Sequence, residues 1–486
     1  MKNIKYLIIA IAGFVFTSCD ADAFLNPLPD TAVAVDAFFQ SDNDVLAGVI
    51  GIYDALQGVN ENTETNISNF NRGVQFEHLL TEHRSDNTRN ATLEGSKSDF
   101  HRYTVNANNV ESEDYWQSMY QVVFRANNIL NFIDIADAGN RAKYTAEAKF
   151  LRAYAYFNLV RLFGDVPLVT NVIGPADDKT PLFTRVPVAQ VYEQIVVDLQ
   201  EAVENLDNSY KSRASKAAAQ AILAKVYLTQ PTKNYSGAQQ LCEAIINSTS
   251  FGLETNYKNV FYNELNNEII FAIQYQAGNA LESQSFSSEF TSSIRAGRED
   301  GQNIVNENLK NLFDTNGGIR TAVSITDLDG RLAIDDFEVA KFLPDGFDYT
   351  SNYGPNARNA GNDYIAIRYA DVLLMHVEAI LAGGAATVNS GALASFQKIK
   401  DRAFPSTAPN TIASITKEDL LQERRIELAF ENQRWYDLLR FGVAETVLSA
   451  HAAQMGYVFT PRALLLPIPA REINISGGLL TQNPGY

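Results

Sequence analysis

Apolar positions recur every three or four residues along much of the chain, a spacing that predicts amphipathic helices. The first helix is expected from about residue 42 to 56, because Ser41 can cap its start and an apolar stripe from Val45 to Leu56 follows. The same spacing then predicts further helices in pairs, at 116–133 with 144–163, 214–228 with 236–246, 369–381 with 392–403, and 417–430 with 434–441.

Small and bulky residues alternate in the pair 214–246, where Ala218 and Ala224 stand among Leu223 and Tyr227, a pattern similar to a tetratricopeptide helix hairpin. Four such pairs predict a mostly α protein with a scaffold of four tetratricopeptide-like helix hairpins. The pairs are unevenly spaced along the chain. We therefore do not expect a uniform solenoid.

Two long segments lack helical spacing. Residues 59–109 are rich in Asn, Thr, Ser, Arg and His, and a block from about 250 to 365 holds polar stretches and a β-favouring run from Glu268 to Tyr275. Long segments without a regular pattern are often functional. We expect the second block to be a loop-rich inserted ligand-binding region containing short strands.

The N-terminus has the features of a secretory signal. Lys2 and Lys5 precede an apolar stretch from Tyr6 to Phe16, which is too short to span a membrane and closes on Thr17-Ser18-Cys19. Cys19 is where lipoprotein processing would leave a cysteine for acylation; the alternative is an ordinary signal peptide with an incidental cysteine.

The predicted organisation follows from these segments. It comprises a signal peptide over 1–18, a lipidated tether over 19–35, and a single domain over 36–486. Within that domain, the N-terminal part covers 36–250, the insertion about 250–365, and the C-terminal helical part 366–486.

Composition narrows the function classes. The chain has 39 Lys and Arg against 57 Asp and Glu, a formal charge of −18, so nucleic acid is an unsuitable partner. It also has 28 Phe and 22 Tyr but only 2 Trp, so some aromatic rings are expected near the surface, where they can stack on a ligand.

Several motifs together resemble the SusD/RagB family, the surface glycan-binding lipoproteins of Bacteroidetes nutrient-uptake systems. The motifs are Ala146-Glu147-Ala148-Lys149-Phe150-Leu151-Arg152-Ala153-Tyr154, Leu162-Phe163-Gly164-Asp165-Val166-Pro167, Arg368-Tyr369-Ala370-Asp371, Glu423-Arg424-Arg425-Ile426-Glu427-Leu428-Ala429-Phe430-Glu431, Arg434-Trp435-Tyr436-Asp437-Leu438, and the closing Asn483-Pro484-Gly485-Tyr486. The likeness covers nearly the whole chain. Read physically, these motifs are scaffold, with charged residues paired on helices and aromatic residues at helix interfaces.

The resemblance implies an outer-membrane, surface-exposed lipoprotein that binds oligosaccharide or polysaccharide and delivers it to a SusC-like TonB-dependent transporter. It implies binding without catalysis, and no cofactor. A peptide-binding lipoprotein of the same transporter-lid architecture remains open, as does a structural surface protein without ligand.

Sugar recognition needs apolar ring faces together with planar polar groups. Two candidate patches in the irregular segments hold both kinds. The first contains Phe70, Asn71, Arg72, His83, Arg84, Asp86, Asn87 and Arg89. Among these, Arg84 and Asp86 are the preferred candidates for ligand contact. The second contains Phe286, Phe290, Arg295, Arg298, Tyr349, Tyr353 and Asn356.

Other chemistry has weaker support. Glu427 and Glu431 have the spacing of a carboxylate pair such as a glycosidase uses, but they stand inside a structural motif. Histidines in the first irregular segment lack any known zinc spacing, and Asp327-Leu328-Asp329-Gly330 lacks the further ligands of a calcium loop. Cys242 and Trp116 are expected in the core.

Overall fold

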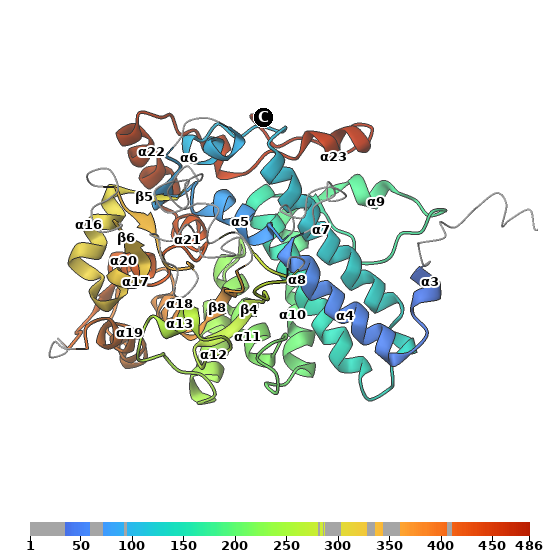
Figure 1. Cartoon of the computed structure of the whole chain (residues 1–486), viewed down its shortest axis with the longest axis horizontal. Helices are drawn as coiled ribbons and strands as arrows, with labels where there is room; N and C mark the ends of the chain where they lie inside the picture. Colours follow the sequence, from blue (N-terminus) through green and yellow to red (C-terminus); the bar gives the residue numbers. More distant parts are fainter. Residues whose placement is uncertain are drawn as a thin grey trace, which may run out of the picture.

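The computed structural model describes residues 35–58, 71–91, 95–279, 282–284, 286, 303–327, 336–343, 360–405 and 411–486. Within this part helices dominate, and strands are few and short (Figure 1). Most helices from the first half of the chain lie on the right or in the middle of the view, and most C-terminal helices lie on the left. One cluster of buried apolar side chains extends from Phe39 to Leu480. The prediction of a mostly α protein is confirmed.

The first predicted helix is present as α4 (Asp42–Gln57), after the single turn α3 (Val35–Phe38). Ser41 caps α4, since its Oγ accepts a hydrogen bond from the Asp44 backbone N–H. The buried positions of α4 include Val45, Val49 and Ile52, which follow the helical period. That face packs against α7 (Val110–Asn131) and α8 (Arg141–Phe163).

The first predicted pair, α7 with α8, is confirmed. Helix α8 packs still more extensively against α10 (Val188–Asn205), which was not among the predicted helices. The buried residues Val191, Ile195, Leu199 and Ala202 of α10 recur at intervals of four and three. That signal was present and could have predicted the helix. Buried on nearly all sides, α8 forms the centre of the first half of the molecule.

The second and third pairs are also confirmed. Helix α11 (Lys216–Thr229) packs on α12 (Tyr235–Asn247), and α18 (Tyr369–Leu381) packs on α19 (Ser390–Ala403). Helix α12 also packs on α18, so the scaffold continues across the inserted block even though about 120 residues of sequence separate them.

The fourth pair is shorter than predicted. Helix α20 (Lys417–Glu427) stops before Phe430, and α21 (Arg434–Arg440) follows it. Phe430 and Asn432 in the turn have φ values of 66° and 58°, in the left-handed region that a helix cannot include. Glu427 ends α20 and Glu431 lies in the turn, and both pair with buried cations.

The segment 59–109 is more regular than predicted. Its described part contains α5 (Gly73–Thr81), β1 (Thr88–Arg89), η2 (Ser96–Ser98) and α6 (Asp99–Arg102). Every residue of α5 is buried. A helix buried on all sides has no alternation of apolar and polar positions, so periodicity alone did not reveal it.

The inserted block joins the scaffold through β4 (Ile269–Ile273), which pairs antiparallel with β8 (Tyr364–Arg368). The β-favouring run predicted from Glu268 to Tyr275 is therefore a strand. A second sheet has the order β1-β5-β7-β6 and includes β5 (Ile304–Val305), β6 (Ile325–Thr326) and β7 (Glu338–Val339). It ties the first irregular segment to the block.

The other elements are short or peripheral. They are η3 (Ile133–Ile135), β2 (Val166–Pro167), α9 (Thr180–Phe183), β3 (Arg185–Val186), α13 (Asn259–Tyr262), α16 (Glu307–Asn316), η4 (Gly318–Arg320), α17 (Thr321–Ser324), β9 (Ala386–Thr387), β10 (Ile415–Thr416), α22 (Ala444–Met455), η6 (Pro461–Leu464) and α23 (Ala470–Ile475). Among the described helices, none combines the length and the apolar character needed to cross a bilayer.

Candidate functional site

Arg84, a residue favoured for ligand contact, lies in the core. Its side chain is fully enclosed, with the guanidinium carbon 4.0 Å from the ring centroid of Trp435. Nη2 donates to the Ala463 carbonyl at 2.5 Å, and Nη1 donates to the Leu80 carbonyl at 3.2 Å. Arg84 therefore joins the turn after α5 to the C-terminal segment.

Asp86 is the centre of a second buried arrangement, which we call the Asp86 cluster: Glu82, Asp86, Asn87, Arg425 and Arg434. Asp86 Oδ1 accepts from Arg434 Nε at 2.8 Å, and Oδ2 lies 3.0 Å from Arg425 Nη2. Burial opposes ionisation of Asp86, but the charges of Arg425 and Arg434 outweigh it and hold the pKa of Asp86 well below its usual range. Asp86 is therefore a carboxylate that neutralises two buried cations.

Asn87 and Glu82 complete the cluster. Asn87 Nδ2 donates to Glu82 Oε2 at 2.9 Å, and its Oδ1 accepts from Arg425 Nε at 2.8 Å. Burial raises the pKa of Glu82 to about 7, while the Asn87 hydrogen bond and the charge of Lys341 oppose that rise. Glu82, Asp86, Asn87 and Arg434 are buried, and Arg425 is largely buried.

His83 is fully buried beside His78, with ring centroids 5.3 Å apart. Burial lowers the pKa of His83 well below its usual value, and the neighbouring His78 and His101 lower it further. The imidazole is therefore neutral at physiological pH. No group of three or more His, Cys, Asp or Glu side chains in the described ranges is placed to hold a metal ion.

Side chains of the first patch contact the inserted block. Asn71 Nδ2 donates to the Ser283 carbonyl at 2.8 Å, and the half-buried Arg89 forms an ion pair with Asp336 at 2.9 Å. Arg72 is also half-buried. In the second patch, Phe286 is a buried anchor whose ring lies against Tyr275, Phe342 and Tyr364. The two irregular regions predicted from sequence are thus brought together.

The proposed lipidation site, Cys19, lies outside the described residues. So do the remaining ligand-binding candidates, which are Phe70, Phe290, Arg295, Arg298, Tyr349, Tyr353 and Asn356. Ligand binding by either patch stays a prediction. Arg84, Asp86 and Asn87 have an additional role that sequence did not reveal, which is to hold the turn after α5 against α20, α21 and the C-terminal segment.

Glu427 and Glu431 are not arranged as a catalytic pair open to a substrate. Glu427 accepts from Arg368 at 2.6 Å and Arg320 at 2.9 Å and also pairs with Arg402, while Glu431 pairs with Lys341 at 2.8 Å and with Arg368. All these side chains are buried. The interpretation of this motif as scaffold agrees with the geometry.

A ligand-sized cleft lies elsewhere, along α7. Its lining combines α7 residues with the segment 167–183 and the C-terminal residues Arg471, Glu472 and Leu480, and it encloses about 410 Å³. Volumes of about 300–1,000 Å³ are typical of small-molecule sites. We call it the α7 cleft. None of the candidate residues predicted from the sequence lines it.

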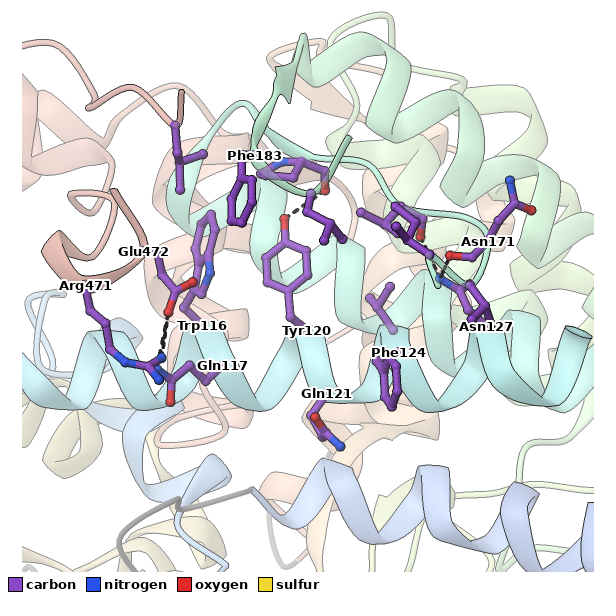
Figure 2. Close-up of a pocket in the computed structure, with 17 residues that line it drawn as sticks. Trp116, Gln117, Tyr120, Gln121, Phe124, Asn127, Asn171, Phe183, Arg471 and Glu472 are labelled. Atoms are coloured by element: carbon purple, nitrogen blue, oxygen red, sulfur yellow. Dashed lines mark hydrogen bonds and ion pairs between the residues drawn. The ribbon is translucent and has the colours of Figure 1, made fainter. Parts of the chain in front are cut away.

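Aromatic and amide side chains share this cleft. Figure 2 shows Trp116 and Tyr120 rising from α7 toward Phe183, with Arg471 and Glu472 at one end and Asn127 and Asn171 at the other. Trp116 is only 3% exposed, and its ring centroid lies 4.9 Å from that of Phe163, so its predicted core position is confirmed. One part of the Trp116 ring nevertheless borders the cleft.

The rim of the α7 cleft carries Gln117, Gln121 and Phe124, which lie on the next face of the helix (Figure 2). Phe124 is 50% exposed, an unusual position for a large aromatic ring on an amphipathic helix.

Comparison with known proteins covers most of the chain. Residues 24–228 match a family model described as starch-binding and associating with the outer membrane, and residues 337–486 match the SusD family model. The two models together take in α7, α8 and the Glu423–Glu431 motif.

Individual proteins similar to this chain agree with the two family models. A SusD-like protein, P2, from Formosa agariphila is 29% identical over the full length of both chains, and a SusD-like protein from Bacteroides ovatus is 26% identical over 90% of this chain and 82% of its own. A solved laminarin-binding SusD-like protein is 26% identical, covers 92% of this chain and 100% of its own, and superposes with a TM-score of 0.74. With both family models and full-length relatives in agreement, this chain belongs to the SusD/RagB family.

Proposed function

We propose that this protein binds oligosaccharide or polysaccharide at the outer face of the outer membrane and delivers it to a SusC-like TonB-dependent transporter. It acts by binding and does not cleave its ligand. The observation that carries the ligand class is the full-length similarity to the laminarin-binding SusD-like protein, because this similarity includes sequence as well as fold.

The architecture supports the proposal. The irregular segments that hold the candidate aromatic and polar side chains are anchored by rigid contacts, namely the Asp86 cluster on one side and the Phe286 aromatic cluster on the other. A binding surface held in one geometry loses less conformational entropy when a ligand binds. Glu427 and Glu431, the carboxylates with a glycosidase-like spacing, are buried and paired with cations, so they cannot flank a glycosidic bond.

Calorimetric titration of the chain lacking residues 1–19 tests the ligand. We expect saturable binding of laminari-oligosaccharides, with dissociation constants of the order of micromolar (about −8 kcal/mol), and no new reducing ends after prolonged incubation. Tryptic peptides of casein serve as the control ligand. Binding of the peptides alone would overturn the sugar assignment, and release of shorter sugars would overturn the non-catalytic role.

The membrane anchor is tested by Cys19→Ala. Acylation at Cys19 would hold the protein to the membrane through lipid, at about 0.8 kcal/mol for each buried CH₂ group. We expect the full-length protein in the outer-membrane fraction together with the transporter, and the variant in the soluble fraction without incorporated palmitate. A Ser18→Ala variant is the control. Membrane retention of Cys19→Ala would show that another element anchors the protein.

A further inference from the structure

We propose that the α7 cleft is a second oligosaccharide-binding site, separate from the two irregular patches. The proposal rests on the proposed function for its choice of ligand class. Its lining contains no residue of either patch. It therefore adds a point of contact for a long glycan that the patches alone would not supply.

The chemistry of the lining suits a sugar. A pyranose ring has an apolar C–H face that packs on aromatic rings and a polar edge of hydroxyls that pairs with planar groups. The half-exposed ring of Phe124 supplies an apolar surface at the rim, beside the amides of Gln117 and Gln121 (Figure 2). At the end of the cleft, Arg471 and Glu472 form an ion pair at 3.0 Å, and Glu472 also accepts from Gln117 at 3.3 Å.

The opposite wall of the cleft is held rigidly. Tyr120 donates its hydroxyl proton to the Pro167 carbonyl at 2.8 Å, and Asn127 Nδ2 donates to the Val169 carbonyl at 3.0 Å. Behind them, Arg152 Nη1 donates to Asn127 Oδ1 at 2.7 Å while its Nε and Nη2 pair with the buried Asp198 at 2.8 Å. The Arg152 motif that identified the family thus fixes one side of the cleft, which preorganises it for a ligand.

A peptide fits this lining less well than a sugar. Extended peptides gain affinity mainly from main-chain hydrogen bonds to an open strand edge. In the segment 169–171, however, the Val169 N–H and carbonyl are bonded to the Tyr156 hydroxyl, and the Thr170 carbonyl accepts from Arg152. The wall therefore presents side chains and little free backbone.

Intrinsic fluorescence gives a readout local to the cleft. The chain has two tryptophans, and Trp435 is fully buried beside Arg84, whereas Trp116 borders the cleft. A sugar bound in the cleft therefore changes the emission of Trp116. The test titrates laminarihexaose, and separately a xylogluco-oligosaccharide and the casein peptides, into the chain lacking residues 1–19 and follows fluorescence and calorimetric heat in parallel.

Phe124→Ala and Gln121→Ala are the test variants. Both side chains lie on the rim, so neither change disturbs the core. We expect a saturable fluorescence change in the unmodified protein and a rise of about tenfold in its dissociation constant in Phe124→Ala. Tyr210→Ala is the matched control, because Tyr210 is 52% exposed but does not line the cleft; its binding should be unchanged.

The outcomes separate the two proposals. Suppose that laminarihexaose binds by calorimetry without a fluorescence change, and binds Phe124→Ala as tightly as the unmodified protein. That result would overturn the proposal that the α7 cleft binds sugar and leave the proposed function standing. Absence of calorimetric binding by laminarihexaose and by xylogluco-oligosaccharide alike would overturn both. A fluorescence change with the casein peptides and none with either sugar would show that the cleft binds peptide, and would overturn the proposal.

Discussion

Glu427→Ala is expected to lower the free energy of unfolding by about 3–5 kcal/mol, because it removes a carboxylate that three buried arginines share and leaves an excess of buried positive charge. Glu427 accepts from Arg320 and Arg368 and also pairs with Arg402, and all four side chains are buried. Urea denaturation of the chain lacking residues 1–19 measures the change.

The same pairing predicts a pH dependence. Burial would raise the pKa of Glu427, but the charges of Arg402, Arg368 and Arg320 hold it well below the usual value. Because the pKa of Glu427 is lower in the folded protein than in the unfolded chain, where it is about 4.3, its ionised carboxylate stabilises the fold above that unfolded value. This stabilisation is lost as the pH falls through the folded pKa. The unmodified protein should therefore lose more stability between pH 5 and pH 3 than Glu427→Ala does.

Glu201→Ala is the matched control for this prediction. Glu201 also pairs with a cation, Lys149, but its side chain is 35% exposed. Solvent-exposed pairs contribute about 0–1 kcal/mol. Equal effects of the two substitutions would contradict the argument that burial of the Glu427 network determines its contribution.

Asp86→Ala is expected to lower the free energy of unfolding by a similar amount, about 3–5 kcal/mol, because it removes the carboxylate that pairs with the buried Arg434 and the largely buried Arg425. The hydrogen bond from Arg434 at 2.8 Å and the contact from Arg425 at 3.0 Å would both be lost. Thermal and urea unfolding measure the change, and calorimetry of the folded variant with laminari-oligosaccharides measures binding.

This experiment separates two roles for a residue chosen as a ligand contact. Loss of stability with little change in the affinity of the folded fraction supports a structural role. Unchanged stability with a lower affinity would contradict that role and support direct contact with ligand. Asp336→Ala is the control, since Asp336 pairs with Arg89 at a half-exposed position and should change stability by no more than about 1 kcal/mol.

The positions of the helices could be predicted where each one buries a single face. Helices α4, α7, α12 and α19 follow from apolar positions spaced three and four apart, and Ser41 caps α4 as a short polar residue does. The family could be identified from motifs whose charges are paired inside the scaffold. Those motifs depend on residue types in a fixed order, which a single sequence shows directly.

Burial and long-range partners were decided only by the tertiary structure. Helix α5 has no amphipathic pattern because all its residues are enclosed, and Arg84 looks like a surface residue until Trp435, about 350 positions away, lies against it. The α7 cleft exists because the segment 167–183 and the C-terminus meet one helix. Sequence determined which amphipathic segments form helices and which family the chain belongs to. Packing determined which polar side chains are structural and which remain open to a ligand, because burial depends on every element that surrounds a residue.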